Sequence, residues 1–99
     1  MRTLVELPAF SKQAKEVWSE PEYEEFTFWM AQNPESGVVI PGTRGGRKVR
    51  YKRAGSGKSG GVRVIYYHLV AHEQILLVTV YAKSDQGNLS ASDINDLLD

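Results

Sequence analysis

Two strand-like runs separated by a short link constrain the fold of this chain more than any other feature. Val62–Val70 and Ile75–Ala82 are rich in β-branched and aromatic residues, a composition typical of strands. The link Ala71–Gln74 is short enough that the two runs predict an antiparallel hairpin. Neither run approaches the roughly 20 apolar residues of a membrane span, and the N-terminus has no apolar secretory segment. We therefore expect a cytoplasmic protein without membrane contact.

The other predicted elements follow from periodicity and from helix-end signals. They are a strand at Thr3–Leu7, a helix at Phe10–Trp18, a helix from Glu20 to Asn33, a strand at Arg47–Arg53 and a last helix capped by Ser90. Glu35–Gly46, around the short apolar run Val38-Val39-Ile40, is predicted to be a connection. The order β-α-α-β-β-β-α predicts an α+β domain, with an antiparallel sheet and helices packed on one face. Residues 1–99 form one domain in this interpretation. The last helix has no C-cap signal before Asp99, which leaves open whether it frays or continues in a longer natural chain.

Charge is strongly segregated along the chain, although the formal net charge is zero. No acid occurs between Ser36 and His72, and eight lysines and arginines lie between Arg44 and Arg63. Such segregation predicts one positive surface that faces a polyanion. The alternative is an ordinary solvated strand face. Against it, Arg63 lies inside an apolar strand, where charged residues are rare unless they have a partner or a function.

Strand alternation predicts how these cations are displayed. Lys48, Arg50 and Lys52 share one face of their strand, opposite Val49 and Tyr51. Arg63 shares a face with Tyr67, and Lys83 shares one with Tyr81. If these sets lie on the open side of the sheet, cations from three strands neutralise phosphates, and the two tyrosine rings stack on bases. We therefore predict RNA binding by Lys52, Lys58, Tyr67 and Tyr81, next to a catalytic set.

Three motifs together resemble the RelE/HigB toxins of bacterial type II toxin–antitoxin systems, and specifically their HigB-like branch. The motifs are the basic strand Arg47-Lys48-Val49-Arg50, the junction Gly57-Lys58-Ser59-Gly60-Gly61-Val62-Arg63, and the strand end Tyr81-Ala82-Lys83. The resemblance covers nearly the whole chain. It implies a ribosome-dependent endoribonuclease that cleaves mRNA in the ribosomal A site by attack of the 2′-hydroxyl. It also implies a cognate antitoxin as partner, and no metal or other cofactor.

Site residues follow from the resemblance position by position. Arg63 matches the family arginine in the strand after the glycine-rich loop, and Lys48 and Arg50 match its pair of basic residues on the preceding strand. Lys83 stands where RelE proteins have an arginine, and Lys58 belongs to the HigB-like loop. The chain departs from RelE proteins near Leu89, where they have a tyrosine and this sequence has no ionisable group. Tyr81 is the nearest substitute in the sequence.

The chemistry of such cleavage assigns tasks to the catalytic set of Lys48, Arg50, Arg63 and Lys83. A base must take the 2′-hydroxyl proton, positive charge must stabilise the phosphate oxygens, and an acid must protonate the leaving 5′-oxygen. Lys48 is the candidate base, because neighbouring arginines disfavour its protonated form. The planar fork of Arg63 suits two phosphate oxygens, and Lys83 stabilises charge or donates the proton.

Two other functions remain open at this stage. A ParE-like gyrase poison would keep the fold and change the target, and a non-catalytic RNA-binding protein would use the same cations for adhesion alone. His68 and His72 do not form a helical metal-binding pair, so we expect no metal site.

Overall fold

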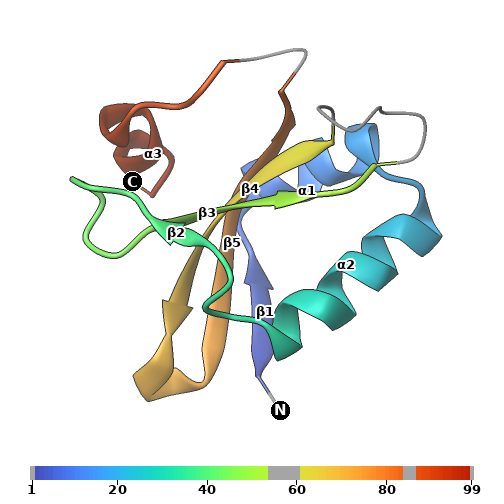
Figure 1. The fold of residues 1–99 in the computed structure, drawn as a ribbon, viewed down its shortest axis with the longest axis horizontal. Helices are drawn as coiled ribbons and strands as arrows, with labels where there is room; N and C mark the ends of the chain where they lie inside the picture. The colour runs from blue at the N-terminus through green and yellow to red at the C-terminus, as the bar shows by residue number, and fades with distance from the viewer. Residues whose placement is uncertain (1, 54–60, 84–86, 99) are drawn as a thin grey trace.

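A computed structural model describes residues 2–53, 61–83 and 87–98 of the chain, and its described elements are arranged around one five-stranded sheet (Figure 1). In chain order they are β1 (Thr3–Glu6), α1 (Pro8–Val17), α2 (Glu20–Gln32), β2 (Val38–Val39), β3 (Arg47–Tyr51), β4 (Val62–Leu69), the 3₁₀ turn η1 (Val70–His72), β5 (Gln74–Ala82) and α3 (Ala91–Leu98). The strand order is β1-β5-β4-β3-β2. None of the helices in the described ranges is long and apolar enough to cross a membrane.

The predicted hairpin forms the centre of the sheet. β4 and β5 pair antiparallel along their whole lengths, and β3 adds antiparallel to β4. The pairing of β4 with β5 is irregular between Ile65 and Tyr66, where the partner changes from Thr79 to Leu77. This bulge leaves Val78 without a partner and turns its side chain to the same face as Ile65, where the two pack together.

The prediction of a purely antiparallel sheet is wrong at one edge. β1 pairs with β5 in parallel, with Thr3 opposite Gln74 and Glu6 opposite Leu77. Both helices α1 and α2 and three strands separate β1 from β5 in sequence, so no tight turn dictates their relative direction. The Val38-Val39 run, predicted as part of a connection, forms β2 at the other edge.

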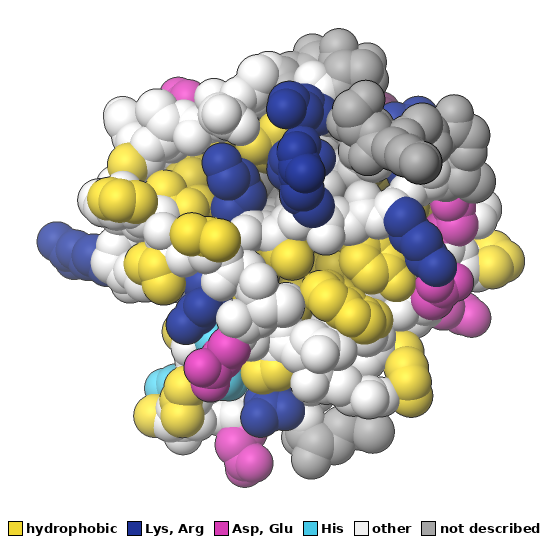
Figure 2. Space-filling model, in the orientation of Figure 1, with side chains coloured by type: hydrophobic (Ala, Val, Ile, Leu, Met, Phe, Trp, Pro, Cys, Tyr) yellow, Lys and Arg dark blue, Asp and Glu magenta, His cyan; other side chains and the backbone are white. Residues whose placement is uncertain are grey.

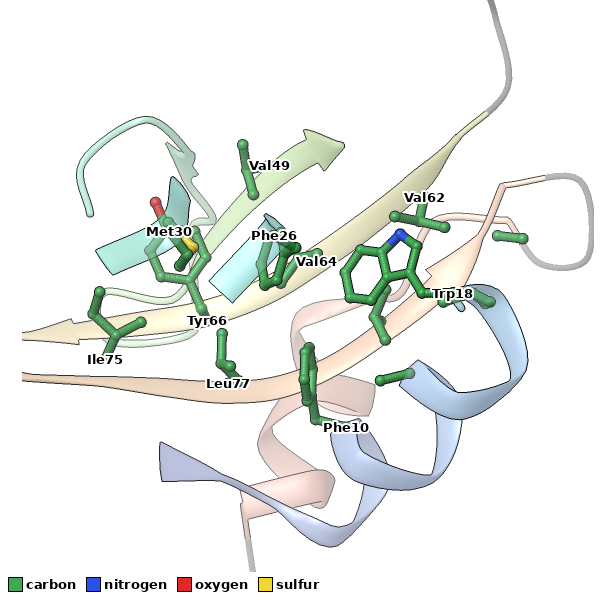
Figure 3. Packing of buried hydrophobic residues seen from close by; sticks show 14 residues of the cluster. Phe10, Trp18, Phe26, Met30, Val49, Val62, Val64, Tyr66, Ile75 and Leu77 are labelled. Atoms are coloured by element: carbon green, nitrogen blue, oxygen red, sulfur yellow. The ribbon is translucent and has the colours of Figure 1, made fainter. Parts of the chain in front are cut away.

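The main core lies between the sheet and helices α1 and α2 (Figure 3). The predicted apolar stripes of both helices are buried here, with Phe10, Phe26 and Met30 fully excluded from solvent. Trp18 stacks on Phe26 at a ring-centroid distance of 4.7 Å. α2 begins as expected at Glu20, and a reciprocal capping box joins Ser19 and Glu22.

The prediction that all helices pack on one face is also wrong. α3 covers the opposite face of the sheet, where Ile94 packs with Ile65, Val78 and Tyr81. The hairpin strands are apolar on both faces, so the second face must also be shielded from solvent by another element. The predicted Ser90 cap is confirmed, since the Asp93 amide donates to Ser90 Oγ and the Ser90 amide donates to Asp93 Oδ2. α3 covers only part of this face, and the uncovered part carries the candidate site.

Candidate functional site

The register of the three central antiparallel strands brings the predicted cations together. Arg50 on β3 lies directly opposite Arg63 on β4, and Arg63 lies opposite Tyr81 on β5. Gly61, immediately before β4, has φ +87°, and a Cβ there would lie 2.6 Å from the carbonyl oxygen of Tyr51. Only glycine allows this close approach, so the predicted Gly-Gly-Val-Arg junction helps to set the register of Arg63.

These residues line an open hollow of about 540 Å³ on the α3 side of the sheet. Its lining consists of Ser36, Val38, Lys48, Val49, Arg50, Arg63, Lys83 and Asn88. The four predicted catalytic residues therefore lie around one hollow. We call this set of eight residues the basic hollow.

Arg63 forms the buried part of the basic hollow. Arg63 is only 4% exposed, and within the described ranges it makes no ion pair with a carboxylate. Among the described residues its guanidinium makes one weak contact, from Nη1 to the Val62 carbonyl oxygen at 3.5 Å. A buried charge is ordinarily paired, and like charges directly opposite on neighbouring strands destabilise a sheet. The arrangement therefore favours an external anion.

The three other cations of the basic hollow are more exposed to solvent than Arg63 is. Lys48 is half-buried, while Arg50 and Lys83 are exposed. Figure 2 shows Lys and Arg side chains gathered in the upper centre of the surface, with hydrophobic side chains beside them. An exposed cationic rim around a buried guanidinium suits a polyanion with several phosphates better than a small ligand with one.

Lys52 does not join this set, although strand alternation predicted that it would. Its ammonium lies 2.6 Å from Oε1 of Glu25 on α2, in a second hollow with Tyr51 and Arg53. The hydrogen bond from Lys52 lowers the pKa of Glu25, and the same bond raises the pKa of Lys52. β3 ends at Tyr51, and Trp18 Nε1 donates to the Lys52 carbonyl oxygen at 3.1 Å, so the chain has already turned toward the helices.

The expectation that Tyr67 and Tyr81 lie on an open face is wrong. Tyr81 packs with Ile94 of α3, and Tyr67 is half-buried against the segment before β3, where a Cβ on Gly46 would lie 3.1 Å from its ring. The Tyr67 hydroxyl donates to the Thr43 carbonyl oxygen at 2.6 Å. Tyr81 is 5% exposed, and neither tyrosine lines the basic hollow. Lys58, the remaining predicted RNA-binding residue, lies outside the described residues.

The hydroxyl of Tyr81 is buried without a hydrogen bond of ordinary geometry to any described residue. Burial raises its pKa, while the nearby backbone amide of Leu89 and the charge of Arg63 act in the opposite direction. Since a phenol with a raised pKa stays protonated near neutral pH, Tyr81 is a proton donor in this environment and a poor base.

Sequence reasoning missed the four neutral residues that line the basic hollow, namely Ser36, Val38, Val49 and Asn88. Ser36 and Val38 precede β3 in a segment that was predicted to be a connection. The β-branched pair Val38-Val39 was the available signal for an edge strand. No comparable signal marks Asn88.

The described residues contain no group of three or more His, Asp or Glu side chains arranged to hold a metal ion. His68 Nδ1 instead lies 4.0 Å from Oε2 of Glu35. This contact joins β4 to the turn after α2 and lies apart from the residues that line the basic hollow.

Comparison with known proteins identifies the fold. No family model matches the sequence. The solved structure of the E. coli toxin RelE, an arginine-to-alanine double mutant in the free state, matches with a TM-score of 0.60 and 11% sequence identity. The match covers 86% of this chain and 86% of that one. The fold is RelE-like. The predicted RelE-like α+β fold is thus confirmed, with the three corrections described above: the parallel direction of β1, the placement of α3 and the additional edge strand β2.

Proposed function

We propose that this chain is a toxin of a bacterial type II toxin–antitoxin system that inhibits translation by cleaving mRNA. One observation carries the proposal. Arg63 is buried without a carboxylate partner in the described structure, directly opposite a second arginine, in a hollow with Lys48 and Lys83. The RelE-like fold supports it, since the matched structure is that of a toxin.

Cleavage proceeds in this proposal by attack of the 2′-hydroxyl on the neighbouring phosphorus. Lys48, in its neutral form, accepts the hydroxyl proton, and the new 2′-O–P bond forms as the P–O5′ bond breaks. Arg63 holds two non-bridging oxygens with its planar fork, while Arg50 adds positive charge. Lys83 stabilises the leaving 5′-oxygen or protonates it. The products are a 2′,3′-cyclic phosphate and a 5′-hydroxyl, and the requirement for a 2′-hydroxyl restricts the activity to RNA.

The biological setting belongs to the same proposal. The substrate is mRNA in the ribosomal A site in the bacterial cytoplasm, and a cognate antitoxin silences the enzyme. The HigB-like junction Gly60-Gly61-Val62-Arg63 supports the HigB-like branch in this proposal. No cofactor is needed for a reaction whose nucleophile belongs to the substrate.

Cleavage of mRNA on programmed ribosomes tests the proposal. Wild-type protein should cut the message, and Arg63→Ala should reduce the rate by roughly 10²–10³, as for removal of one donor to a developing oxyanion. Lys12→Ala is the matched control, because it removes an exposed cation from α1, which packs on the opposite face of the sheet. It should cut at the wild-type rate.

The outcomes separate the competing functions. An intact message with wild-type protein and gyrase-dependent DNA breaks in intoxicated cells would indicate a ParE-like gyrase poison. An intact message together with Arg63-dependent RNA binding would indicate a non-catalytic RNA-binding protein. Equal cleavage by wild-type protein and Arg63→Ala would remove the catalytic role of the basic hollow.

A further inference from the structure

Val38 places an exposed apolar side chain at the rim of the basic hollow. It is 74% exposed, and it lies opposite Lys48 in the pairing of β2 with β3, so both side chains point to the α3 side of the sheet. A single exposed valine needs no explanation by itself. Val38 differs because it lines the same hollow as Arg50 and Arg63.

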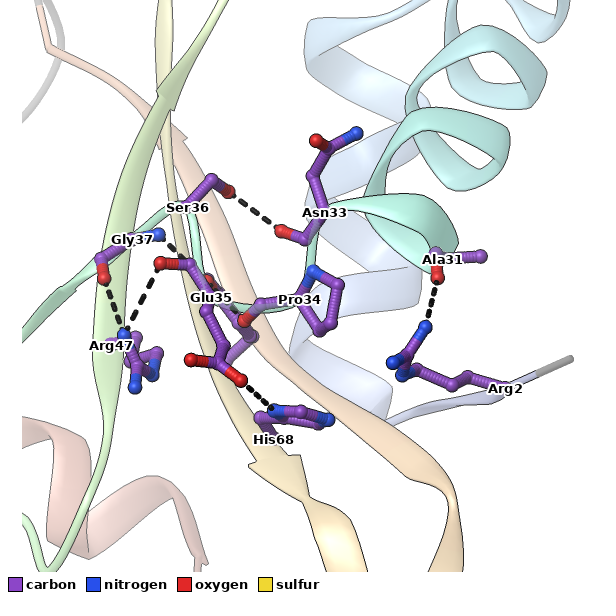
Figure 4. Close-up of polar contacts among 10 residues, drawn as sticks. Arg2, Ala31, Asn33, Pro34, Glu35, Ser36, Gly37, Arg47 and His68 are labelled. Carbon is purple, nitrogen blue, oxygen red and sulfur yellow. Dashed lines mark hydrogen bonds and ion pairs between the residues drawn. The ribbon is translucent and has the colours of Figure 1, made fainter.

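The backbone that precedes Val38 is held by side chains of β3 and β4 (Figure 4). Tyr66, fully buried on β4, donates its hydroxyl hydrogen to the Pro34 carbonyl oxygen at 2.8 Å and accepts from the Gly37 amide at 2.9 Å. Arg47 Nη1 donates to the Gly37 carbonyl oxygen at 2.8 Å. A Cβ at Gly37 would lie 2.8 Å from the Tyr66 hydroxyl oxygen, so this close attachment requires glycine. Val38 is thus held in place before any ligand binds, and little entropy is lost when it is contacted.

Strand order sets the distance between Val38 and the phosphate position. β2, β3 and β4 are successive neighbours, and neighbouring strands lie about 4.8 Å apart. Val38 lies opposite Lys48, and Lys48 lies opposite Ile65, two residues along β4 from Arg63. Two strand spacings and this two-residue offset place the Cα atoms of Val38 and Arg63 roughly 12 Å apart. An RNA strand whose phosphate binds Arg63 and which crosses the strands toward β2 would bring an adjacent base over Val38.

The hydroxyl of Ser36, the polar side chain that lines the hollow next to Val38, already donates a hydrogen bond within the protein. Ser36 lies two residues earlier in the chain, and the acceptor is the Asn33 carbonyl oxygen at 2.8 Å. The contact at this rim is therefore mainly apolar, which suits the flat face of an unpaired base.

We propose that Val38 is a platform for a nucleobase next to the phosphate held by Arg63. The inference rests on the proposed function and adds a subsite to it. Because packing on an aliphatic surface reads no hydrogen-bonding edge, the subsite requires a base and discriminates little among bases. Any preference should favour purines, which have the larger face.

Binding of two short RNA analogues tests the platform. The first is 2′-O-methyl hexa-adenylate, which lacks the attacking hydroxyl, and the second has the same backbone without bases. Val38→Thr should weaken binding of the first roughly three- to tenfold, on the scale of one base contact, and leave binding of the second unchanged. Val38→Phe should tighten binding of the first alone.

Val39→Thr is the matched control, since Val39 is 50% exposed on the same strand and lies opposite Arg47, on the other face. It should bind both analogues as wild type does, and thermal melting should show that all three variants are folded. Equal losses with both analogues, an equal effect of Val39→Thr, or a Val38→Thr effect on antitoxin binding alone would overturn the platform. If Arg63→Ala does not weaken binding of either analogue, the proposed function fails instead.

Discussion

Replacing Arg63 with methionine should abolish activity without lowering stability, because the fold gains little from this guanidinium. Arg63 is 4% exposed, lies opposite Arg50 and has no ion-pair partner in the described parts of the chain. Side chains directly opposite on neighbouring strands have Cβ atoms roughly 5 Å apart, and two guanidinium groups at an assumed separation of about 7 Å would repel by about 2 kcal/mol at an effective dielectric constant of 20. Exposure of Arg50 reduces this to about 1 kcal/mol. Methionine keeps most of the aliphatic stem, so a new cavity is largely avoided.

The expected free energy of unfolding is therefore unchanged or about 1 kcal/mol higher, which corresponds to a rise of at most roughly 4–8 °C in Tm for a domain of this size. Thermal and urea melts at low salt measure it. The gain should shrink in 0.5 M salt, where screening weakens the repulsion. Cleavage on programmed ribosomes should fall by roughly 10²–10³. Arg63→Lys, which keeps the charge and loses the planar fork, should recover RNA binding better than it recovers cleavage.

A loss of more than about 1.5 kcal/mol in Arg63→Met, independent of salt, would refute this reasoning, since it exceeds the effect of a volume-conserving core substitution. It would mean that Arg63 stabilises the fold through the backbone of β4. The lack of a carboxylate partner among the described residues would then not point to a ligand.

Three further predictions concern the residues around the site. Lys83→Ala should reduce the slope of log K against log salt for single-stranded RNA by about 0.7, the value for one lost phosphate contact, as measured by titration at several salt concentrations. Tyr81→Phe removes a buried hydroxyl that makes no hydrogen bond of ordinary geometry with a described residue, so urea denaturation should show a free energy of unfolding that is unchanged or up to about 1 kcal/mol higher. A loss of cleavage with RNA binding intact would show instead that the hydroxyl serves the reaction. Burial and a hydrogen bond to Glu6 raise the pKa of Tyr23 to about 12. The folded chain then keeps a proton that the unfolded chain releases, so stability should fall between pH 10 and 12, and Tyr23→Phe should flatten this fall in denaturation curves.

Local sequence rules were sufficient for most individual elements. Alternation predicted that Val49 and Tyr51 face the core while Lys48 and Arg50 face away, and both pairs do so. The Ser90 cap was also predicted, because it depends on residues three apart in the chain. Lys52 failed the same alternation rule, because β3 ends one residue earlier and Glu25 on a distant helix attracts the ammonium.

The candidate site itself was predictable only in part. Composition and alternation placed Lys48, Arg50, Arg63 and Lys83 on strand faces, and the family resemblance selected these four as the catalytic set. All four line one hollow. The position of Val38 at the rim of the basic hollow could not be predicted, since it depends on the pairing of β2 with β3 and on the hydrogen bond between Gly37 and Tyr66. Nothing in a local window reports contacts between residues nearly thirty positions apart.

The sequence by itself determined the order of the helices, the central hairpin and the faces on which its cations emerge, because these follow from periods of two and of 3.6 residues. Only the tertiary structure decided that β1 runs parallel to β5, that α3 covers the second face, and that Arg63 lies buried opposite Arg50. These outcomes depend on which apolar surfaces are buried against one another once all the elements pack together. Burial and cross-strand register are properties of the assembled sheet.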